Sequence, residues 1–310
     1  MNPTKDSNSI GAFTNTDFKD PNILDRSKYG PSGYSSETEE KEPKTVVVAT
    51  AENLQFKINE AENGDIISLE AGNYDIPQSL IINKKLTIQS SDKSKVTLNY
   101  SGAENSPLFQ LQPKGFLSLK NVTLKGNNSQ YTFASLKENM FTHFGLTVSD
   151  CDISDFNYVL KVYKESFAER ITFESTSISN CENGLELSEE TNDLGDYNTE
   201  YLTINNCKFN NVKSNVIDYY RGGYDESTIG GNLLVTNSTF TNCGSEEKNG
   251  ILINSHGIVN VDISNNTFNN NPVKLVALLW GAKNNSHKNN EINNSGEIRV
   301  EENLEMKLMY

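Results

Sequence analysis

The chain has 310 residues and carries 27 basic against 41 acidic side chains, which gives a formal net charge of −14. This balance disfavours nucleic acid as a partner, because contacts to phosphates require a basic face. The longest apolar run, residues 273–280, is interrupted by Lys274 and is too short to cross a bilayer, so no membrane span is expected.

Residues 1–45 are rich in Asp, Asn, Ser, Lys and Glu, contain four prolines and show no sustained hydrophobic periodicity. This composition is typical of a linker or tail. The N-terminus has no apolar segment of the kind found in a signal peptide. The sequence therefore indicates either a cytoplasmic protein or a form from which an export signal has been removed.

Residues 53–62 form the one stretch with helical periodicity, with Leu54, Ile58 and Ala61 on one face. Thr50 is a suitable N-cap for this helix. We expect the helix to cover the open end of the first coil of a solenoid and to hide strand edges that would otherwise pair with other chains.

From residue 46 to residue 310 a short sequence motif recurs, with clear copies at residues 202–209, 233–240 and 261–268. Each copy has two apolar residues two positions apart, then a polar residue, then another apolar residue. The polar residues are 25 to 31 positions apart: Ser90, Asn121, Asp150, Ser175, Asn206, Asn237 and Asn265. A repeat of this length indicates stacked units, none of which buries its apolar face alone.

The repeated motif predicts a strand followed by a bend. Apolar residues two positions apart lie on one face of a strand, and Asn suits tight turns because it tolerates left-handed backbone angles. Stacked Asn side chains also form hydrogen-bond ladders between coils. We therefore predict an all-β fold, a right-handed parallel β-helix with a short N-terminal capping helix, over residues 46–310.

The four cysteines lie at or beside the repeated bend, at spacings close to the coil period: Cys151, Cys181, Cys207 and Cys243. This pattern favours a stacked column of free thiols over disulfides. No Cys-x-x-Cys pair points to zinc or redox chemistry, and no metal ligands are predicted.

Residues 218–228 form the densest polar segment outside the repeat. Two glycines follow Arg221 and allow the backbone to turn sharply, so that the guanidinium is presented to a ligand, while Tyr220 and Tyr224 offer flat faces for sugar rings. The alternative is a structural corner in which Arg221 pairs with a nearby carboxylate such as Glu226.

Residues 160–170 form a second candidate segment. If they are a strand, Lys161 and Tyr163 share one face, and Lys164 is the next residue in the sequence. Neighbouring coils of a β-helix are about 4.8 Å apart, so Lys161 and Arg221 are placed to line one groove. The alternative is a solvated strand face with ordinary salt bridges.

His256, in a turn before a strand, has the ordinary pKa of a proton carrier near neutral pH. A local hydrogen bond in the turn is the alternative role. Trp280 is either a stacking platform or the end of the apolar run. The sequence has no Ser-His-Asp order, phosphate loop or nucleotide fingerprint, and we predict no catalytic residues.

Three phrases, residues 197–203, 220–228 and 271–276, resemble the C-terminal β-helix of two-domain alginate lyases in polysaccharide lyase family six, relatives of chondroitinase B. The resemblance covers about residues 46–310. Residues 23–33 are similar to the linker between the two helices of that family, and residues 8–13 resemble the end of a preceding catalytic domain.

The resemblance implies a Lys and an Arg as base and acid, with calcium held by Asn and Glu side chains. In the family these residues belong to the N-terminal helix, and no matching constellation is found in this sequence. The resemblance thus implies an accessory domain without its own catalytic centre or cofactor. Its implied partners are alginate or a related acidic polysaccharide, the catalytic β-helix of the same enzyme, and a second copy in a homodimer.

Substrate contact is expected from eight residues: Lys161, Tyr163, Lys164, Tyr220, Arg221, Tyr224, Glu226 and His256. The resemblance also implies a secreted, periplasmic or cell-surface location. Two alternatives stay open, so the sequence does not decide whether the chain is an enzyme. One is a calcium-dependent lyase that acts by β-elimination with Lys161, Tyr163 and Arg221, and the other is a purely structural spacer or dimerisation module.

Overall fold

The structure is a computed structural model that describes residues 45–48, 51–136, 143–163, 166–187, 199–220, 230–248 and 250–301. Contacts divide the chain into two units, Met1–Glu42 and Pro43–Tyr310, and all described residues belong to the second. The expected linker, residues 1–45, lies outside the described residues except for Thr45, where the first strand begins.

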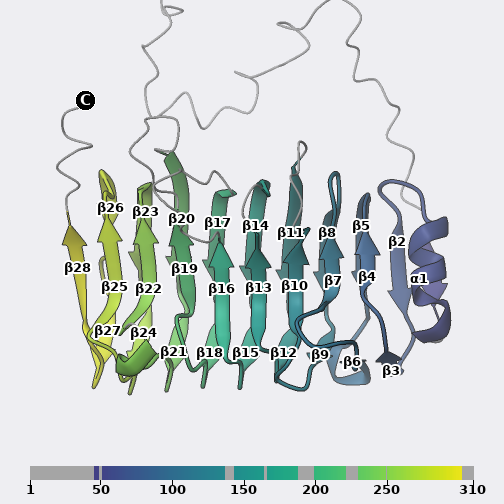
Figure 1. Cartoon of the computed structure of the whole chain (residues 1–310), viewed down its shortest axis with the longest axis horizontal. Coiled ribbons are helices and arrows are strands. Elements are labelled where there is room, and N and C mark those ends of the chain that lie inside the picture. Colours follow the sequence, from purple (N-terminus) through teal and green to yellow (C-terminus); the bar gives the residue numbers. More distant parts are fainter. Residues whose placement is uncertain are drawn as a thin grey trace, which may run out of the picture. The chain divides into compact units, whose positions relative to one another are not determined.

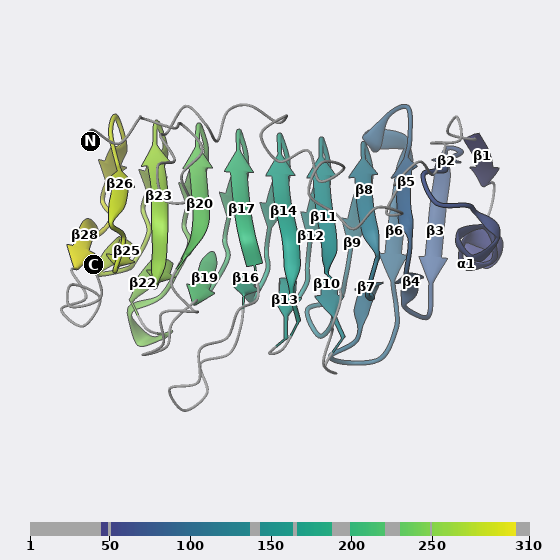
Figure 2. The same cartoon turned by 90° about the horizontal axis from the view of Figure 1, so that it is seen from above.

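Strands of the second unit form three parallel sheets that run side by side (Figures 1 and 2). Sheet A contains β1 (Thr45–Val48), β2 (Ile66–Leu69), β5 (Lys85–Gln89), β8 (Phe116–Lys120), β11 (Phe144–Ser149), β14 (Ala168–Glu174), β17 (Thr199–Asn205), β20 (Gly230–Thr236), β23 (Ile258–Ser264) and β26 (Asn284–Ser286). Sheet B contains β3 (Gly72–Ile76), β6 (Val96–Tyr100), β9 (Thr123–Lys125), β12 (Asp152–Ser154), β15 (Ser177–Ser179), β18 (Lys208–Asn210), β21 (Thr239–Thr241), β24 (Thr267–Asn269) and β27 (Glu291–Asn293). Sheet C contains β4 (Leu80–Ile82), β7 (Pro107–Leu111), β10 (Tyr131–Ser135), β13 (Tyr158–Val162), β16 (Asn183–Leu187), β19 (Ile217–Tyr220), β22 (Ile251–His256), β25 (Leu275–Trp280) and β28 (Glu297–Glu301).

One α-helix and two short 3₁₀ helices complete the described elements: α1 (Ala51–Glu60), η3 (Lys93–Lys95) and η5 (Glu246–Lys248). Helix α1 packs against β1, β3 and β4 at the N-terminal side of the solenoid (Figure 1). Leu54, Ile58 and Ala61 are all buried, as their spacing predicts. The predicted parallel β-helix with a short N-terminal helix is confirmed, whereas the N-cap Thr50 lies outside the described residues.

The core fills the space between the three sheets, because alternate residues of each strand point inward. Identical side chains stack from coil to coil in register. Phe209, Phe240 and Phe268 follow one another on sheet B, and their ring centroids are 5.1 and 4.9 Å apart in nearly parallel planes. All three are buried. Each coil therefore depends on its neighbours for most of its apolar contacts.

The repeated polar residues make the bends between sheets A and B. All of them except Ser90 have left-handed backbone angles, with φ between 49° and 60°. Their side chains also form the expected ladders, since the amide of Asn206 donates to Ser175 at 3.0 Å and that of Asn289 donates to Asn265 at 3.1 Å. Asn, Asp and Ser are thus selected here for conformation and for bonding along the stack.

All four cysteines are free and buried, and burial raises their thiol pKa values to about 11–12. The prediction of one column of thiols is wrong in detail. Each coil has one bend between sheets A and B and another after its sheet B strand. Cys151 and Cys207 follow the first of these bends, and Cys181 and Cys243 follow the second. Thr176 separates the first pair, where its hydroxyl accepts from the amide of Cys151 at 3.4 Å.

Candidate functional site

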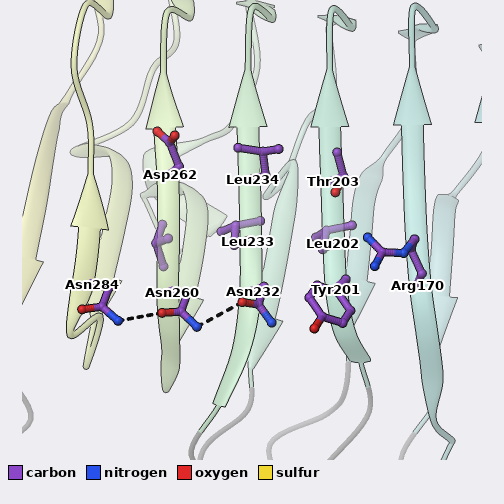
Figure 3. Close-up of a pocket in the computed structure, with 11 residues that line it drawn as sticks. Arg170, Tyr201, Leu202, Thr203, Asn232, Leu233, Leu234, Asn260, Asp262 and Asn284 are labelled. Atoms are coloured by element: carbon purple, nitrogen blue, oxygen red, sulfur yellow. Dashed lines mark hydrogen bonds between the residues drawn. The ribbon is translucent and has the colours of Figure 1, made fainter. Parts of the chain in front are cut away.

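A shallow groove of about 370 Å³ lies on the outer face of sheet A, across β14, β17, β20, β23 and β26 (Figure 3). Two rows of outward side chains border it, and both rows run across the strands from coil to coil. Residues in a row are register partners in neighbouring strands, and the two rows are two positions apart along each strand. The groove is therefore a direct product of strand register.

The first row, called the Arg170 row below, consists of Arg170, Tyr201, Asn232, Asn260 and Asn284. Its three amides are chained head to tail (Figure 3): Asn284 donates to Asn260 at 2.8 Å, and Asn260 donates to Asn232 at 3.0 Å. Asn232 donates to the backbone oxygen of Glu200 at 3.2 Å. Each amide has two N–H groups and an oxygen with two lone pairs, so further donors and acceptors are available to a ligand.

Arg170 supplies the positive charge of the groove. Its guanidinium carbon lies 4.4 Å from the ring centroid of Tyr201, and its side chain is exposed. Among the described residues, no carboxylate lies within ion-pair distance of this guanidinium. Stacking on the tyrosine orients the planar fork of N–H donors, which matches the geometry of a carboxylate.

The second row is less uniform. Thr203 and the exposed Leu234 are followed by Asp262, whose carboxylate accepts a hydrogen bond from the Ser264 hydroxyl. Figure 3 shows Leu234 and Asp262 on the other side of the groove from the chained amides. The groove thus carries a cation at its β14 end and an anion three coils away.

The sequence-predicted residues that the structure describes lie on sheet C. Lys161 is in β13, Tyr163 directly follows β13, Tyr220 ends β19 and His256 ends β22. The other four predicted contacts lie outside the described residues: Lys164, Arg221, Tyr224 and Glu226. A shared groove for Lys161 and Arg221 therefore stays a prediction.

Lys161 is mostly buried and forms an ion pair with Glu186 of the next coil. Its ammonium also lies 4.8 Å from the ring centroid of Tyr158 and 5.4 Å from that of Tyr163, which confirms that Lys161 and Tyr163 share a face. The salt bridge matches the alternative that the sequence left open, but the strand face is buried at Lys161 and not solvated as that alternative supposed. A paired and buried ammonium is a poorer contact for a polymer carboxylate than an exposed guanidinium.

His256 lies between two other rings on sheet C. Its ring centroid is 4.3 Å from that of Tyr220 and 3.8 Å from that of Trp280, and the planes are tilted by about 30°. Burial lowers the pKa of His256 to about 4. A general acid or base works best with a pKa near the operating pH, so the predicted role as a proton carrier near neutrality is disfavoured. Trp280 is part of this ring column.

Replacing His256 by phenylalanine is expected to make the fold more resistant to acid. The unfolded chain binds a proton at this histidine near pH 6.5, whereas the folded chain binds it only near pH 4. The histidine therefore costs no stability above pH 6.5, and its cost grows as the pH falls from 6.5 to 4. Urea midpoints at pH 7 and pH 4.5 measure the effect.

The midpoint of the wild-type chain is expected to fall further between these pH values than that of His256→Phe. Substitution of the exposed His287 by asparagine serves as the control for replacing a histidine outside this ring column. An equal drop in His256→Phe and wild type contradicts the prediction, because the titrating carboxylates are common to both chains.

Sequence reasoning did not single out the Arg170 row. The signal is present, since its members are separated by 31, 31, 28 and 24 residues, close to the coil period. The bends reveal the period because Asn recurs there, whereas this row changes residue type from Arg to Tyr to Asn. Only the strand register shows that these residues are neighbours.

Two further findings concern the described residues. They contain no group of three or more His, Cys, Asp or Glu side chains that is placed to hold a metal ion. No helix among them is long and apolar enough to cross a membrane.

Solved structures similar to this chain include two of the PL6 family alginate lyase AlyGC. A mutant form of AlyGC matches with a TM-score of 0.75 and 25% identity over 88% of this chain, which corresponds to 40% of the lyase. A second AlyGC structure matches with a TM-score of 0.65 and 24% identity over 86% of this chain and 42% of the lyase. No family model and no curated protein matches the sequence.

The chain thus spans about two fifths of the length of these lyases. The likeness supports a β-helix related to the alginate lyases of polysaccharide lyase family six. It applies equally to an accessory and to a catalytic β-helix, so the choice between the two depends on the chemistry of the site.

Proposed function

We propose that this chain is an accessory, non-catalytic β-helix that holds an acidic polysaccharide such as alginate in the groove of sheet A. The observation that carries the proposal is Arg170, an exposed guanidinium stacked on Tyr201 at the head of a row of amides. The structural likeness to alginate lyases supports a polyuronate as the ligand.

The groove offers each chemical group of a uronate chain a matching partner. The fork of Arg170 donates two parallel hydrogen bonds to one carboxylate. The remaining amide donors and acceptors of Asn232 and Asn260 suit sugar hydroxyls, which both donate and accept. The amides are already held in place by one another, so little side-chain entropy is lost when the ligand binds.

The catalytic alternative requires a base near C5 of the sugar and an electrophile on the carboxylate in the same place. Lys161, the lysine of that alternative, pairs with Glu186. We therefore favour the accessory role. Incubation with alginate, with calcium and with a chelator, is expected to yield no unsaturated uronate by ultraviolet absorbance, and calcium-dependent product would support the lyase.

The accessory role implies a catalytic β-helix of the same enzyme as the partner that acts on the bound chain. It also implies a location outside the cytoplasm, where the polysaccharide is found. A homodimer is the remaining proposed assembly. Co-purification with a separately produced catalytic β-helix, followed by light scattering, tests both assemblies in one experiment.

Replacing Arg170 by glutamine is expected to weaken alginate binding about tenfold or more, because a hydrogen bond to a charged group contributes about 1.5–3 kcal/mol. Calorimetric titration with a uronate hexamer measures the loss. Lys208→Gln is the matched control, since Lys208 is an exposed cation on sheet B. If Arg170→Gln folds normally by circular dichroism and binds as tightly as wild type, the groove is not the site.

A further inference from the structure

The Arg170 row continues beyond the groove toward the N-terminal coils. Arg170 pairs in register with Gly145 of β11, Gly145 with Phe116 of β8, and Phe116 with Lys85 of β5. These four residues are called the N-terminal track below. Strands β5, β8, β11 and β14 follow one another side by side on sheet A in both views (Figures 1 and 2). A cation therefore lies at each end of the track.

Gly145 leaves the middle of the track free of a side chain. A Cβ atom at this position would lie 2.7 Å from the ring of Phe116, so the ring occupies the space that a side chain would take. Phe116 is half-buried, and its ring lies between the positions of Lys85 and Arg170. A flat, half-buried apolar ring lying over this glycine suits the carbon face of a sugar.

The register shift between Phe144 and Gly145 also favours this arrangement. It gives β14 one more residue than β11 at this point, and two consecutive residues of β14, Glu169 and Arg170, are exposed. Such bulges re-aim side chains. The Oε2 atom of Glu169 lies 3.3 Å from Nδ1 of His143. Arg170 instead packs its guanidinium against the ring of Tyr201, its register partner in the Arg170 row.

A row of hydroxyls runs beside the track, two positions further along each strand. Its members are half-buried and are register partners in five consecutive coils: Thr87, Ser118, Thr147, Thr172 and Thr203. Hydroxyls donate and accept hydrogen bonds, as sugar hydroxyls do. On the other side of Arg170 the same row continues with the exposed Leu234 and then Asp262. Within this row, a carboxylate-bearing chain therefore meets hydroxyls on the N-terminal side of Arg170 and repulsion from Asp262 on the C-terminal side.

From this asymmetry we infer that the polyuronate held in the groove extends beyond Arg170, over the Phe116 ring that covers Gly145, to Lys85, along the solenoid axis. Lys85 is then a second carboxylate contact, and it is exposed on the outer face of sheet A. This inference rests on the proposed function, because it extends the same site to a longer ligand. The inference predicts that affinity depends on the length of the polyuronate.

Lys85 and Arg170 are three coils apart, about 14 Å at about 4.8 Å per coil. A sugar unit in an extended chain advances about as far as one coil, so the two cations contact units three apart. A uronate dimer is too short to reach both cations, whereas a hexamer reaches both. Length dependence therefore distinguishes the track from a single contact at Arg170.

The test compares Lys85→Gln with wild type by calorimetric titration of an alginate-derived uronate hexamer and dimer. We expect Lys85→Gln to bind the hexamer five- to tenfold more weakly and to bind the dimer as wild type does. Lys208→Gln, on sheet B, is the control and is expected to match wild type with both ligands. Equal hexamer affinity in Lys85→Gln and wild type contradicts the inference that the polyuronate follows the N-terminal track.

Two further variants show whether a negative result concerns the N-terminal track alone or the proposed function as well. If Arg170→Gln weakens hexamer binding while Lys85→Gln does not, the ligand does not follow the N-terminal track and the proposed function stands. If neither variant changes binding, both are wrong. Asp262→Asn is expected to raise hexamer affinity well below tenfold, because the added sugar units lie on the N-terminal side of Arg170, away from Asp262. A rise of tenfold in this variant would show that the chain runs toward the C-terminal coils instead.

Discussion

Replacing Phe240 by alanine is expected to lower the free energy of unfolding by about 3–5 kcal/mol, the usual cost of removing a buried aromatic side chain. Phe240 is fully buried on β21, and its ring stacks on Phe209 of the preceding coil and Phe268 of the following coil. The truncation leaves a cavity between two coils. Neighbouring coils supply one another's contacts in a solenoid, so both interfaces of the central coil are weakened.

Chemical denaturation followed by circular dichroism measures this loss. Phe56→Ala is the matched control, since Phe56 is 56% exposed on α1 and its truncation leaves no internal cavity. We expect the control to change the free energy of unfolding by about 0.5 kcal/mol or less. A loss for Phe240→Ala as small as that of the control would contradict the description of sheet B as a close-packed wall of the core.

Alanine at Gly184 is expected to destabilise the fold by about 1–3 kcal/mol or more, as overpacking of a close-packed interior does. Gly184 lies in β16, and a Cβ atom there would be 2.1 Å from the backbone oxygen of Val216 in the next coil. Val216 is held on both sides: its oxygen accepts from Leu185 at 2.8 Å and its N–H donates to Leu252 at 2.9 Å. The clash therefore forces a change in coil spacing.

Thermal and urea midpoints of Gly184→Ala measure this strain. Gly72→Ala is the control, because the nearest atom to its added Cβ would be in Tyr74 at 3.8 Å, an ordinary contact. The control is expected to stay close to wild type. Midpoints of Gly184→Ala that equal those of the control would show that the two coils can separate at no cost, which is incompatible with close packing between β16 and the next coil.

The fold was predictable because its signals are local and repeated. Apolar residues two apart and a polar bend residue recur once per coil, and each copy is readable within about eight residues of sequence. The helix over Leu54 and Ile58 was found by the same reasoning, with a period of 3.6 in place of 2. The separation of the cysteines into two columns was missed, since it depends on which of two bends each cysteine follows.

The site was less predictable, because its contacts join residues of different coils. Local alternation placed Lys161 and Tyr163 on one face, which is correct. The sequence contains no sign that Glu186, 25 residues later, pairs with Lys161. Arg170 was overlooked for the same reason. It becomes a candidate contact only because Tyr201 and Asn232 of the following coils continue its row, and these residues are distant in the sequence.

Arginine footprinting tests most directly whether the groove of sheet A holds the polysaccharide. The chain has four arginines, Arg26, Arg170, Arg221 and Arg299. Phenylglyoxal labelling with and without a uronate hexamer, read by mass spectrometry, compares their accessibility within one sample. We predict that the hexamer protects Arg170, while Arg299, which pairs with Glu297 on β28, keeps its labelling. Protection of Arg221 with unchanged labelling of Arg170 would contradict binding in this groove and move the polysaccharide site to the segment that the sequence alone had favoured.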